Sequence, residues 1–577
     1  MPTLSGLSRD FRSSYLDHAT LTAQLEAWRD AYPTLVRLTS IAKTPEGRDL
    51  WLLTIGTEPD RVRPTAWVDG NMHASELAGS SVALAIAEDI LRAHVEPESF
   101  GALGVPAPIL ERVRATRFFI LPRMSPDGAE CVLKTGRYVR SVPRDDRNDR
   151  GAMRWRSEDV DGDGLTFVMR QVDPTGDYVA ASAAHPDLLV TRELDDPGPY
   201  YRVYPEGVIE NWDGFRVPMW SYVGDNPVDL NRNFPWSWSP THEQIGAGAY
   251  PASEPESRAV VELAVAHPEI YTWLNLHCYG GVFIRPLGHQ PDSKLDVDDM
   301  GLWKLIERFA AEDTGYPVVS GYEEFLYAPD APLHGDLSDF AYHQRGAVAY
   351  VIELWDLFKR LGLPRPKRFV DYYTHLTRAD IEKLAAWDKE HNQGRVVRPW
   401  KKVQHPQLGE VEVGGVDPRF GVWNPPPELL DEVCRAQSKC FLRVAALAPQ
   451  LNVRVARAVP LGDGVSRVEI VVDNTGYLPT YVLASAKKLE WNEPLYADAA
   501  CGGDCTLVDA AGARVTLGHL EGWGRGVGTG ANELAYQRSA GNLAAARGTW
   551  LVRGKGVVRV RAGSCRTGFV DATIEVG

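Results

Sequence analysis

Four short, almost wholly apolar runs constrain the fold of this chain more than any other feature. Each run has the length and the residue types of a central strand that is covered on both faces of a sheet. The runs are residues 65–68, 117–121, 271–276 and 347–354. Strands of this kind are typical of sheets flanked by helices, so the chain is expected to build an α/β core.

Helix-like segments alternate with the apolar runs. Residues 77–91 are apolar nearly all round, which predicts a buried helix. Further helix-like segments follow at residues 256–267, 302–312 and 377–389. This alternation predicts a mixed, mostly parallel central sheet flanked by helices.

The pattern changes in the last third of the chain. With 577 residues the chain is too long for one ordinary core. Residues 395–406 read as a basic, Pro-containing linker, and period-two runs with Gly-rich turns follow. We predict an α/β domain over residues 1–394 and a smaller all-β sandwich over 407–577. An irregular insertion at about residues 131–228 is interpreted as a lid or binding loop, or as surface decoration.

The bulk composition narrows the class of protein. A net charge of −15 argues against a general binder of nucleic acid or anionic membranes. No apolar segment has membrane-spanning length, and residues 1–12 lack the pattern of a secretory signal. We therefore expect a cytoplasmic protein, with secretion after removal of a leader as the open alternative. Of seven scattered Cys, Cys501 and Cys505 are interpreted as a reduced pair in a hairpin turn rather than a redox or metal pair.

Two histidines and a glutamate stand beside predicted strands. His73 and Glu76 follow the first run and are three residues apart, so both can reach one cation from a turn or helix start. His277 directly follows the run 271–276, at the carboxyl end of a strand, where ligand sites collect in open α/β sheets. Taken singly, these residues also fit a solvated helix start and a core histidine.

Two further polar features stand out. Glu353 lies inside an apolar run, where a carboxylate is costly to bury unless it is paired, protonated or used for proton transfer. Residues 229–234 form the polar cluster Asp-Leu-Asn-Arg-Asn-Phe. Its Arg232 has the planar fork that grips a carboxylate through two hydrogen bonds.

Four ordered motifs resemble those of the M14 zinc carboxypeptidases, which range from digestive enzymes to their bacterial relatives. The motifs are His73-x-x-Glu76, Asn231-Arg232-Asn233-Phe234, His277-Cys278-Tyr279 and Glu353-Leu354. The resemblance covers roughly residues 21–389. It implies the zinc carboxypeptidase fold, here in a bacterial-type member with a large insertion and a C-terminal β-domain.

The resemblance also implies a metal site and a mechanism. His73, Glu76 and His277 would be the two-His, one-Glu ligand set for one zinc ion per chain. Water would fill the fourth position, and Glu353 would take a proton from it during attack on the scissile carbonyl. The same Glu353 would then protonate the leaving amine.

The implied contacts to the substrate backbone come from two segments of the chain. Asn231 and Arg232 match the pair that holds the terminal carboxylate of the substrate. Arg156, in the segment Trp155-Arg156, resembles the arginine that stabilises the oxyanion, and Arg154 is its neighbouring alternative. Exopeptidase character would depend on Arg232.

The remaining implied contacts are aromatic or small. Tyr327 matches the mobile Tyr that closes over the substrate, and Tyr279 belongs to the third motif. Ser338, fifteen residues before the general base, stands where the family reads the substrate side chain. Ser75 replaces a common Arg and Cys278 a common Ser, so the outer substrate contacts are expected to differ from those of other members.

One segment of the insertion begins like a calcium loop. Asp159, Asp161 and Asp163 alternate before a turn Gly, as calcium ligands do. The twelfth position is Arg170 in place of the closing Glu. A plain Asp/Gly hairpin turn is therefore the favoured interpretation over a calcium site.

The sequence predicts a zinc-dependent hydrolase that removes C-terminal residues from peptides with a free carboxylate. A close alternative is an amidohydrolase of small acylated amino acids or cell-wall peptides that uses the same site. A function of another class is an inactive scaffold whose β-domain binds a partner.

Overall fold

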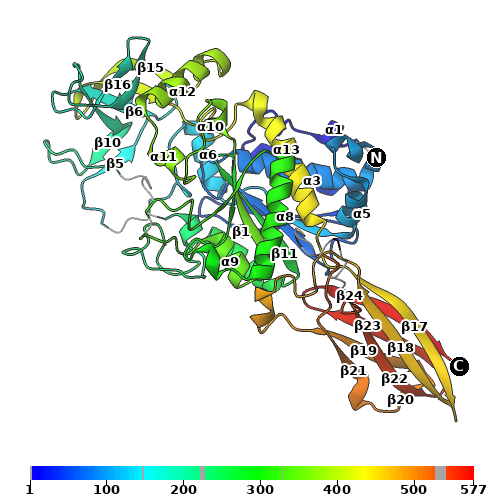
Figure 1. Ribbon diagram of the computed structural model, residues 1–577. Helices are drawn as coiled ribbons and strands as arrows, with labels where there is room; N and C mark the ends of the chain where they lie inside the picture. The colour runs from blue at the N-terminus through cyan, green and yellow to red at the C-terminus, as the bar shows by residue number, and fades with distance from the viewer. Residues whose placement is uncertain are drawn as a thin grey trace.

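The centre of the molecule is an eight-stranded sheet (Figure 1). The computed structural model describes residues 3–145, 149–220, 228–328, 330–524, 526, 534 and 541–577. In sheet order the strands are β1 (Val36–Lys43), β2 (Asp49–Ile55), β4 (Arg117–Leu121), β3 (Thr65–Gly70), β11 (Ile270–Cys278), β14 (Val348–Leu354), β12 (Val282–Arg285) and β13 (Val318–Ser320).

The four predicted apolar runs occupy the middle of this sheet. Strands β4, β3, β11 and β14 lie side by side and parallel, whereas β2 and β12 flank them antiparallel. Every residue of β3, β4 and β11 is buried. The mixed, mostly parallel sheet is therefore confirmed, and the carboxyl ends of β3, β11 and β14 meet at one edge.

Helices cover both faces of the sheet. The predicted buried helix is α3 (Ala78–Val95), whose residues 78–91 are all buried. The other helices are α1 (Leu4–Leu7), α2 (His18–Ala31), α4 (Pro97–Phe100), α5 (Ala107–Ala115), α6 (Pro126–Thr135), α7 (Pro255–Ala266), α8 (Val297–Asp313), α9 (Leu337–His343), α10 (Leu357–Arg360), α11 (Asp371–Thr374), α12 (Arg378–His391) and α13 (Pro427–Ala445).

The insertion builds a sheet of its own. Its strands β6 (Val168–Val172), β7 (Tyr178–Ser182), β8 (His185–Thr191) and β9 (Tyr201–Pro205) form six strands together with β15 (Val397–His405) and β16 (Gly409–Val416). A two-stranded sheet pairs β5 (Arg154–Ser157) with β10 (Gly207–Glu210). Residues 397–416, predicted as linker and start of the sandwich, thus belong to the insertion's sheet.

The predicted domain boundary is corrected as a consequence. Helix α13 packs against α3 and α8 of the front part, and Ser438 on α13 donates a hydrogen bond to Asp89 of α3. The sandwich begins only at β17 (Leu451–Gly462). Period-two polarity identified the hairpin β15–β16 as strands, but the pattern of one strand carries no information on which sheet it joins.

The C-terminal β-sandwich consists of two four-stranded sheets that share a separate core. One sheet is β17, β18 (Val465–Asn474), β22 (Ala545–Arg553) and β20 (Thr506–Leu507). The other is β21 (Arg514–Gly518), β19 (Leu495–Gly503), β23 (Gly556–Ser564) and β24 (Gly568–Val576). Both sheets contribute to the core through residues such as Val468, Trp550 and Val560. In Figure 1 the sandwich extends away from the main body.

Two expectations from composition concern membranes and cysteines. No described helix combines the length and the apolar character that crossing a bilayer requires. The cytoplasmic location stays a prediction. All seven Cys are free thiols, and Cys505 donates a weak hydrogen bond to the carbonyl of Gly502 in the hairpin beside Cys501.

Candidate active site

The loop between β3 and α3 carries the first two candidate ligands. The strand end and the helix start approach closely, since a Cβ atom on Gly79 would lie 2.8 Å from the backbone N of Asn71. Asn71 has a left-handed backbone (φ 56°) and donates hydrogen bonds to the carbonyls of His73 and Ala74. These contacts fix the loop so that His73 and Glu76 point to the carboxyl end of the sheet.

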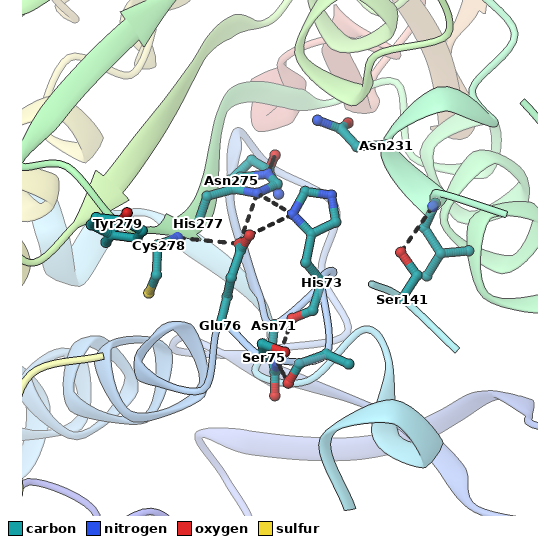
Figure 2. A network of polar contacts seen from close by, with 12 residues as sticks. Asn71, His73, Ser75, Glu76, Ser141, Asn231, Asn275, His277, Cys278 and Tyr279 are labelled. Atoms are coloured by element: carbon teal, nitrogen blue, oxygen red, sulfur yellow. Dashed lines mark hydrogen bonds and ion pairs between the residues drawn. The ribbon is translucent and has the colours of Figure 1, made fainter. Parts of the chain in front are cut away.

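His73, Glu76 and His277 meet at this edge (Figure 2). Glu76 lies between the two rings: Oε1 is 2.7 Å from Nδ1 of His73, and Oε2 is 3.0 Å from Nδ1 of His277. The two Nδ1 atoms are themselves 3.0 Å apart. All three side chains are buried. The structure thus brings together the three residues that the sequence proposed as ligands.

The outer nitrogen of each ring has its own acceptor. Nε2 of His73 is 3.1 Å from Oδ1 of Asp229, and Nε2 of His277 is 2.5 Å from Oδ1 of Asn275. The Asn275 amide is oriented by Asp69, which accepts a hydrogen bond from its Nδ2. Asp229 and Asn275 each offer an acceptor oxygen to an Nε2 atom, which places both Nε2 atoms to donate outward and leaves both Nδ1 atoms to present lone pairs to a cation.

Such a set of donors fits a divalent cation. Two imidazole lone pairs at 3.0 Å with no proton between them repel unless a cation lies between them. Two His nitrogens and one carboxylate oxygen are a ligand set of catalytic zinc, and the outward hydrogen bonds are the usual support of metal-bound histidines.

The charges around the cluster reinforce one another. Burial opposes ionisation of Glu76, but the attraction of His73 and His277 is stronger and lowers its pKa. Burial likewise opposes ionisation of Asp229, whereas Arg140 and His73 bring its pKa well below the usual range. Both carboxylates are therefore ionised at neutral pH.

Glu353 lies on the strand next to His277. In the parallel register of β11 and β14 the two residues are direct partners. Among the described residues none donates a hydrogen bond to the Glu353 carboxylate or forms an ion pair with it, although the side chain lines the cavity. Burial and the negative charge of Glu76 raise the pKa of Glu353 well above its ordinary value. A carboxyl group in this state accepts protons readily.

A cavity of about 950 Å³ opens over the cluster and contains the proposed substrate contacts. Arg232 donates to the carbonyl of Asn231 and forms no ion pair with any residue in the described part of the chain. The Asn231 amide donates to Asp336 and accepts from the backbone of Leu337. Asn231 thereby supports the start of α9 as well as the cavity wall.

Ser338, Tyr279 and Tyr327 also line this cavity. The Ser338 hydroxyl donates to Asp336, so it is already satisfied within α9. Tyr327 is 61% exposed and projects from the rim. Contact of these three residues with a substrate stays a prediction.

The structure replaces Arg156 by another arginine at the cluster. Arg156 and Arg154 lie on β5 and pair with Glu210, away from the cavity. Arg140 instead lines the cavity, with Nε 2.9 Å from Asp229 and Nη1 3.6 Å from Glu76. The segment Trp155-Arg156 resembled the motif locally, but its strand pairs with β10 in the insertion, so its side chains cannot reach the cluster.

Three residues of the site escaped the sequence analysis. Arg140 stands in an irregular stretch without periodicity, and no local signal singled it out. Asp229 opened the polar cluster 229–234 but received no role. Asn275 interrupts an otherwise apolar run, and a buried amide beside a candidate ligand was the available signal.

The calcium-like loop lies beside one acidic and one basic side chain. Carboxylate oxygens of Asp159, Asp161 and buried Glu206 lie within 4.8 Å of one another. The Lys401 ammonium is 3.0 Å from Oδ2 of Asp161. The carboxylates of Asp159, Asp161 and Asp163 accept backbone N–H groups within the turn, as the hairpin interpretation expects.

The sequence model of one protein family, described as zinc carboxypeptidase, matches residues 21–175 and 211–378. The two ranges cover more than half of the chain and contain every residue of the cluster. The chain belongs to the zinc carboxypeptidase family. Zinc is the metal of this family, in agreement with the ligand set at His73, Glu76 and His277.

Individual members of the zinc carboxypeptidase family show more distant likeness. Carboxypeptidase M of Mus musculus is 26% identical over 264 residues, which are 42% of this chain and 56% of that protein. The zinc carboxypeptidase of Saccharothrix mutabilis subsp. capreolus is 29% identical over 137 residues, 23% of this chain and 29% of that protein. The chain thus spans about half the length of the first relative and less of the second.

A solved structure and a second family model complete the comparison. Carboxypeptidase A from Helicoverpa armigera aligns with a TM-score of 0.38 and 20% identity, covering 61% of this chain and 67% of that one. Residues 450–575 match a domain of unknown function (DUF8731). This range coincides with the β-sandwich that begins at β17.

Proposed function

We propose that this member of the zinc carboxypeptidase family is a zinc-dependent hydrolase that removes C-terminal residues from peptides. The observation that carries the proposal is the convergence of three ligand atoms beside a half-buried carboxyl group that has no hydrogen-bond or ion-pair partner among the described residues. His73, Glu76 and His277 would hold the metal, and Glu353 stands next to them in the same cavity.

The chemistry divides between the metal and the protein. Zinc, when bound, supplies a Lewis acid that acidifies water and polarises a carbonyl group. Glu353 accepts the proton released when water attacks the scissile carbonyl, and its raised pKa suits this role. The same carboxyl group then donates this proton to the leaving amine. Glu353 thus acts first as a general base and then as a general acid.

Arg140 and Arg232 supply the positive charge that a peptide needs. Arg140 lines the cavity beside the cluster, where negative charge develops on the carbonyl oxygen. Arg232 has most of its guanidinium hydrogens available for the terminal carboxylate of the substrate. Peptides with a free C-terminal carboxylate are therefore the proposed substrates.

The same site would serve an amidohydrolase of small acylated amino acids or cell-wall peptides. The cavity of about 950 Å³ is larger than such a small substrate requires, which favours peptides. An inactive scaffold is disfavoured because the lone-pair donors and Glu353 are all in position.

The decisive experiment uses synthetic peptides that differ only in a free or amidated C-terminus, with products read by mass spectrometry. The wild-type protein should release the last residue from the free peptide and spare the amidated one. Glu353→Gln should retain zinc and lose about 10²- to 10⁴-fold in kcat. Glu323→Gln, an exposed glutamate outside the cavity, serves as the matched control and should keep full activity.

Two further measurements test the metal and the carboxylate grip. Zinc content should be about one ion per chain at this site and should be lost in His73→Ala and His277→Ala. Arg232→Ala should lower kcat/KM on free peptides about 10- to 100-fold, the value of a hydrogen-bonded charge. Wild-type protein without zinc, or equal cleavage of amidated peptides, would reject the proposal.

A further inference from the structure

A second cluster of metal-binding side chains lies behind the cavity, at helix α9. Asp339 and His343 are four residues apart on this helix and therefore project from the same face. His289, which follows strand β12, reaches the same point, and its Nδ1 is 2.8 Å from Oδ2 of Asp339. One ligand-type atom from each residue lies within 4.8 Å of the other two.

The cluster is enclosed on several sides. Asp339 has no exposed surface and accepts a hydrogen bond of 3.0 Å from the backbone N of Gly288. The His343 ring stacks on Trp236 with centroids 4.2 Å apart and planes inclined by 15°. The rings of His289 and His343 are 5.4 Å apart. The three side chains are thus held in place by packing.

One nitrogen atom of the cluster has no hydrogen-bond partner among the described residues. This atom is Nε2 of His343, which is buried. An imidazole with an unpaired nitrogen beside a buried carboxylate is a group whose hydrogen-bonding capacity is unfilled.

We propose that His289, Asp339 and His343 form a second divalent-metal site that takes zinc. Two imidazole nitrogens and one carboxylate oxygen suit zinc and other late transition metals, whereas calcium and magnesium prefer oxygen ligands alone. Water completes the coordination of such an ion. The site needs a shift of the side chains, because ligand atoms around one zinc ion lie closer together than 4.8 Å.

A neighbouring amide is placed to support this ligand set. The Gln290 amide is 2.5 Å from Nε2 of His289. With the amide turned by half a rotation, its carbonyl oxygen accepts the Nε2 hydrogen and leaves Nδ1 as the metal ligand. This is the same arrangement that Asn275 provides for His277 in the first site.

The second site would act on structure rather than on substrate. Asp336, just before α9, and Ser338, on its first turn, line the substrate cavity. Asp339 and His343 do not line it. Asp336 also accepts the hydrogen bond from Asn231. A metal ion at the second site would therefore pin α9 and, through Asp336, the wall that carries Asn231.

The number of bound zinc ions tests this proposal independently of the proposed activity. Full-length protein is equilibrated with zinc chloride, passed through a desalting column in metal-free buffer and analysed for zinc by mass spectrometry. Two ions per chain are expected for the wild type. His343→Phe, which keeps a ring on Trp236, should retain one ion and melt at a lower temperature with zinc than the wild type. His391→Ala, on the exposed end of α12, is the matched control and should retain two.

A second variant separates the two sites. His73→Ala should also retain one ion, and addition of His343→Phe to it should leave none. Cobalt added to His73→Ala should give the visible absorption of a cobalt-histidine complex, which covers the case that His343→Phe does not fold. The second site is rejected if His73→Ala binds neither zinc nor cobalt, or if His343→Phe holds as much zinc as the wild type. Loss of zinc in His343→Phe with none lost in His73→Ala would instead reject only the first site.

Discussion

At the scale of single residues, the hydrogen bonds at the Nε2 atoms of His73 and His277 control which tautomer each ring adopts. Asn275 accepts from Nε2 of His277 and is itself held by Asp69. Asn275→Leu removes this acceptor, so the ring is free to adopt the other tautomer. We expect zinc affinity to fall about 10- to 100-fold, measured by competition with a chelator.

Thr272→Val provides the control for this prediction on the same strand. The Thr272 hydroxyl is also buried and hydrogen-bonded, to the carbonyl of Val348, but it lies far from the cluster along β11. Its replacement should leave zinc affinity unchanged. Equal weakening in both variants would mean that strand stability, not the tautomer of His277, controls binding.

The choice between two arginines gives a second prediction. Arg140 lines the cavity and Arg156 lies on β5 with its side chain 51% exposed. Arg140→Ala should lower kcat about 10²- to 10³-fold, as removal of an oxyanion donor does, whereas Arg156→Ala should change kcat less than about twofold. Steady-state kinetics on one peptide, with zinc content checked in each variant, compares them. The reverse order would restore Arg156.

At the scale of elements, the turn between β9 and β10 contains a carboxyl group in an unfavourable place. Glu206 is fully buried and accepts the backbone N–H groups of Val160 and Phe167. Burial, followed by the charges of Asp161 and Asp159, raises its pKa from 4.5 to about 7. The folded protein therefore binds this proton more tightly than the unfolded chain.

The sign of the resulting pH dependence follows from linkage. Below pH 4.5 the Glu206 carboxyl group is neutral in both states and costs nothing. As the pH rises through about 7 the unfolded chain gains from ionisation first, so the folded state loses stability, and above that pH the loss is complete. In Glu206→Gln the fall in melting temperature between pH 5 and pH 8 should be smaller than in the wild type. Calorimetry in the presence of a chelator measures both, and an unchanged fall would contradict the assignment.

The local pattern of apolar and polar residues predicted β11 and α3 correctly because it reflects which faces of a strand or helix are buried. The run 271–276 and the helix-like segment 77–91 became β11 and α3, since a strand or helix covered on all sides must be apolar throughout. The hairpin β15–β16 shows the limit of the same signal. Its alternation indicated strands, but it pairs with β6 of the insertion, more than two hundred residues earlier in the chain.

At the scale of the whole molecule, one buried arginine of the sandwich contacts the part of the chain that carries the central sheet, which is called the catalytic part below. Arg566, in the turn between β23 and β24, is fully buried and donates to the carbonyls of Pro268, Ile270, Arg345 and Gly346. These carbonyls lie at the amino ends of β11 and β14, on the side of the sheet away from the cluster. The sandwich is thus docked against the base of the central sheet.

Replacement of Arg566 should weaken the contact between the sandwich and the central sheet without unfolding either part. Arg566→Met leaves four buried carbonyls without their donor and should cost about 3 kcal/mol or more in stability, given 1.5–3 kcal/mol for a hydrogen bond to a charged group. Calorimetry should then separate the unfolding of the sandwich from that of the catalytic part. Arg561→Met, an exposed arginine on β23, is the control. A single unshifted transition in Arg566→Met would show that other contacts, such as the hydrogen bonds from Ala484 to Asp299 and from Trp491 to Gln344, hold the two parts together.

The sequence by itself determined the fold class, the four middle strands of the central sheet and the chemical character of the first site. These features are local: apolar runs of fixed length imply buried strands, and polar residues at strand ends imply a site at one sheet edge. Only the tertiary structure decided that Arg140 rather than Arg156 reaches the cluster, that β15 and β16 join the insertion, and that His289 meets His343 behind the cavity. Each of these depends on contacts between distant segments, for which the pattern of either segment alone carries no information.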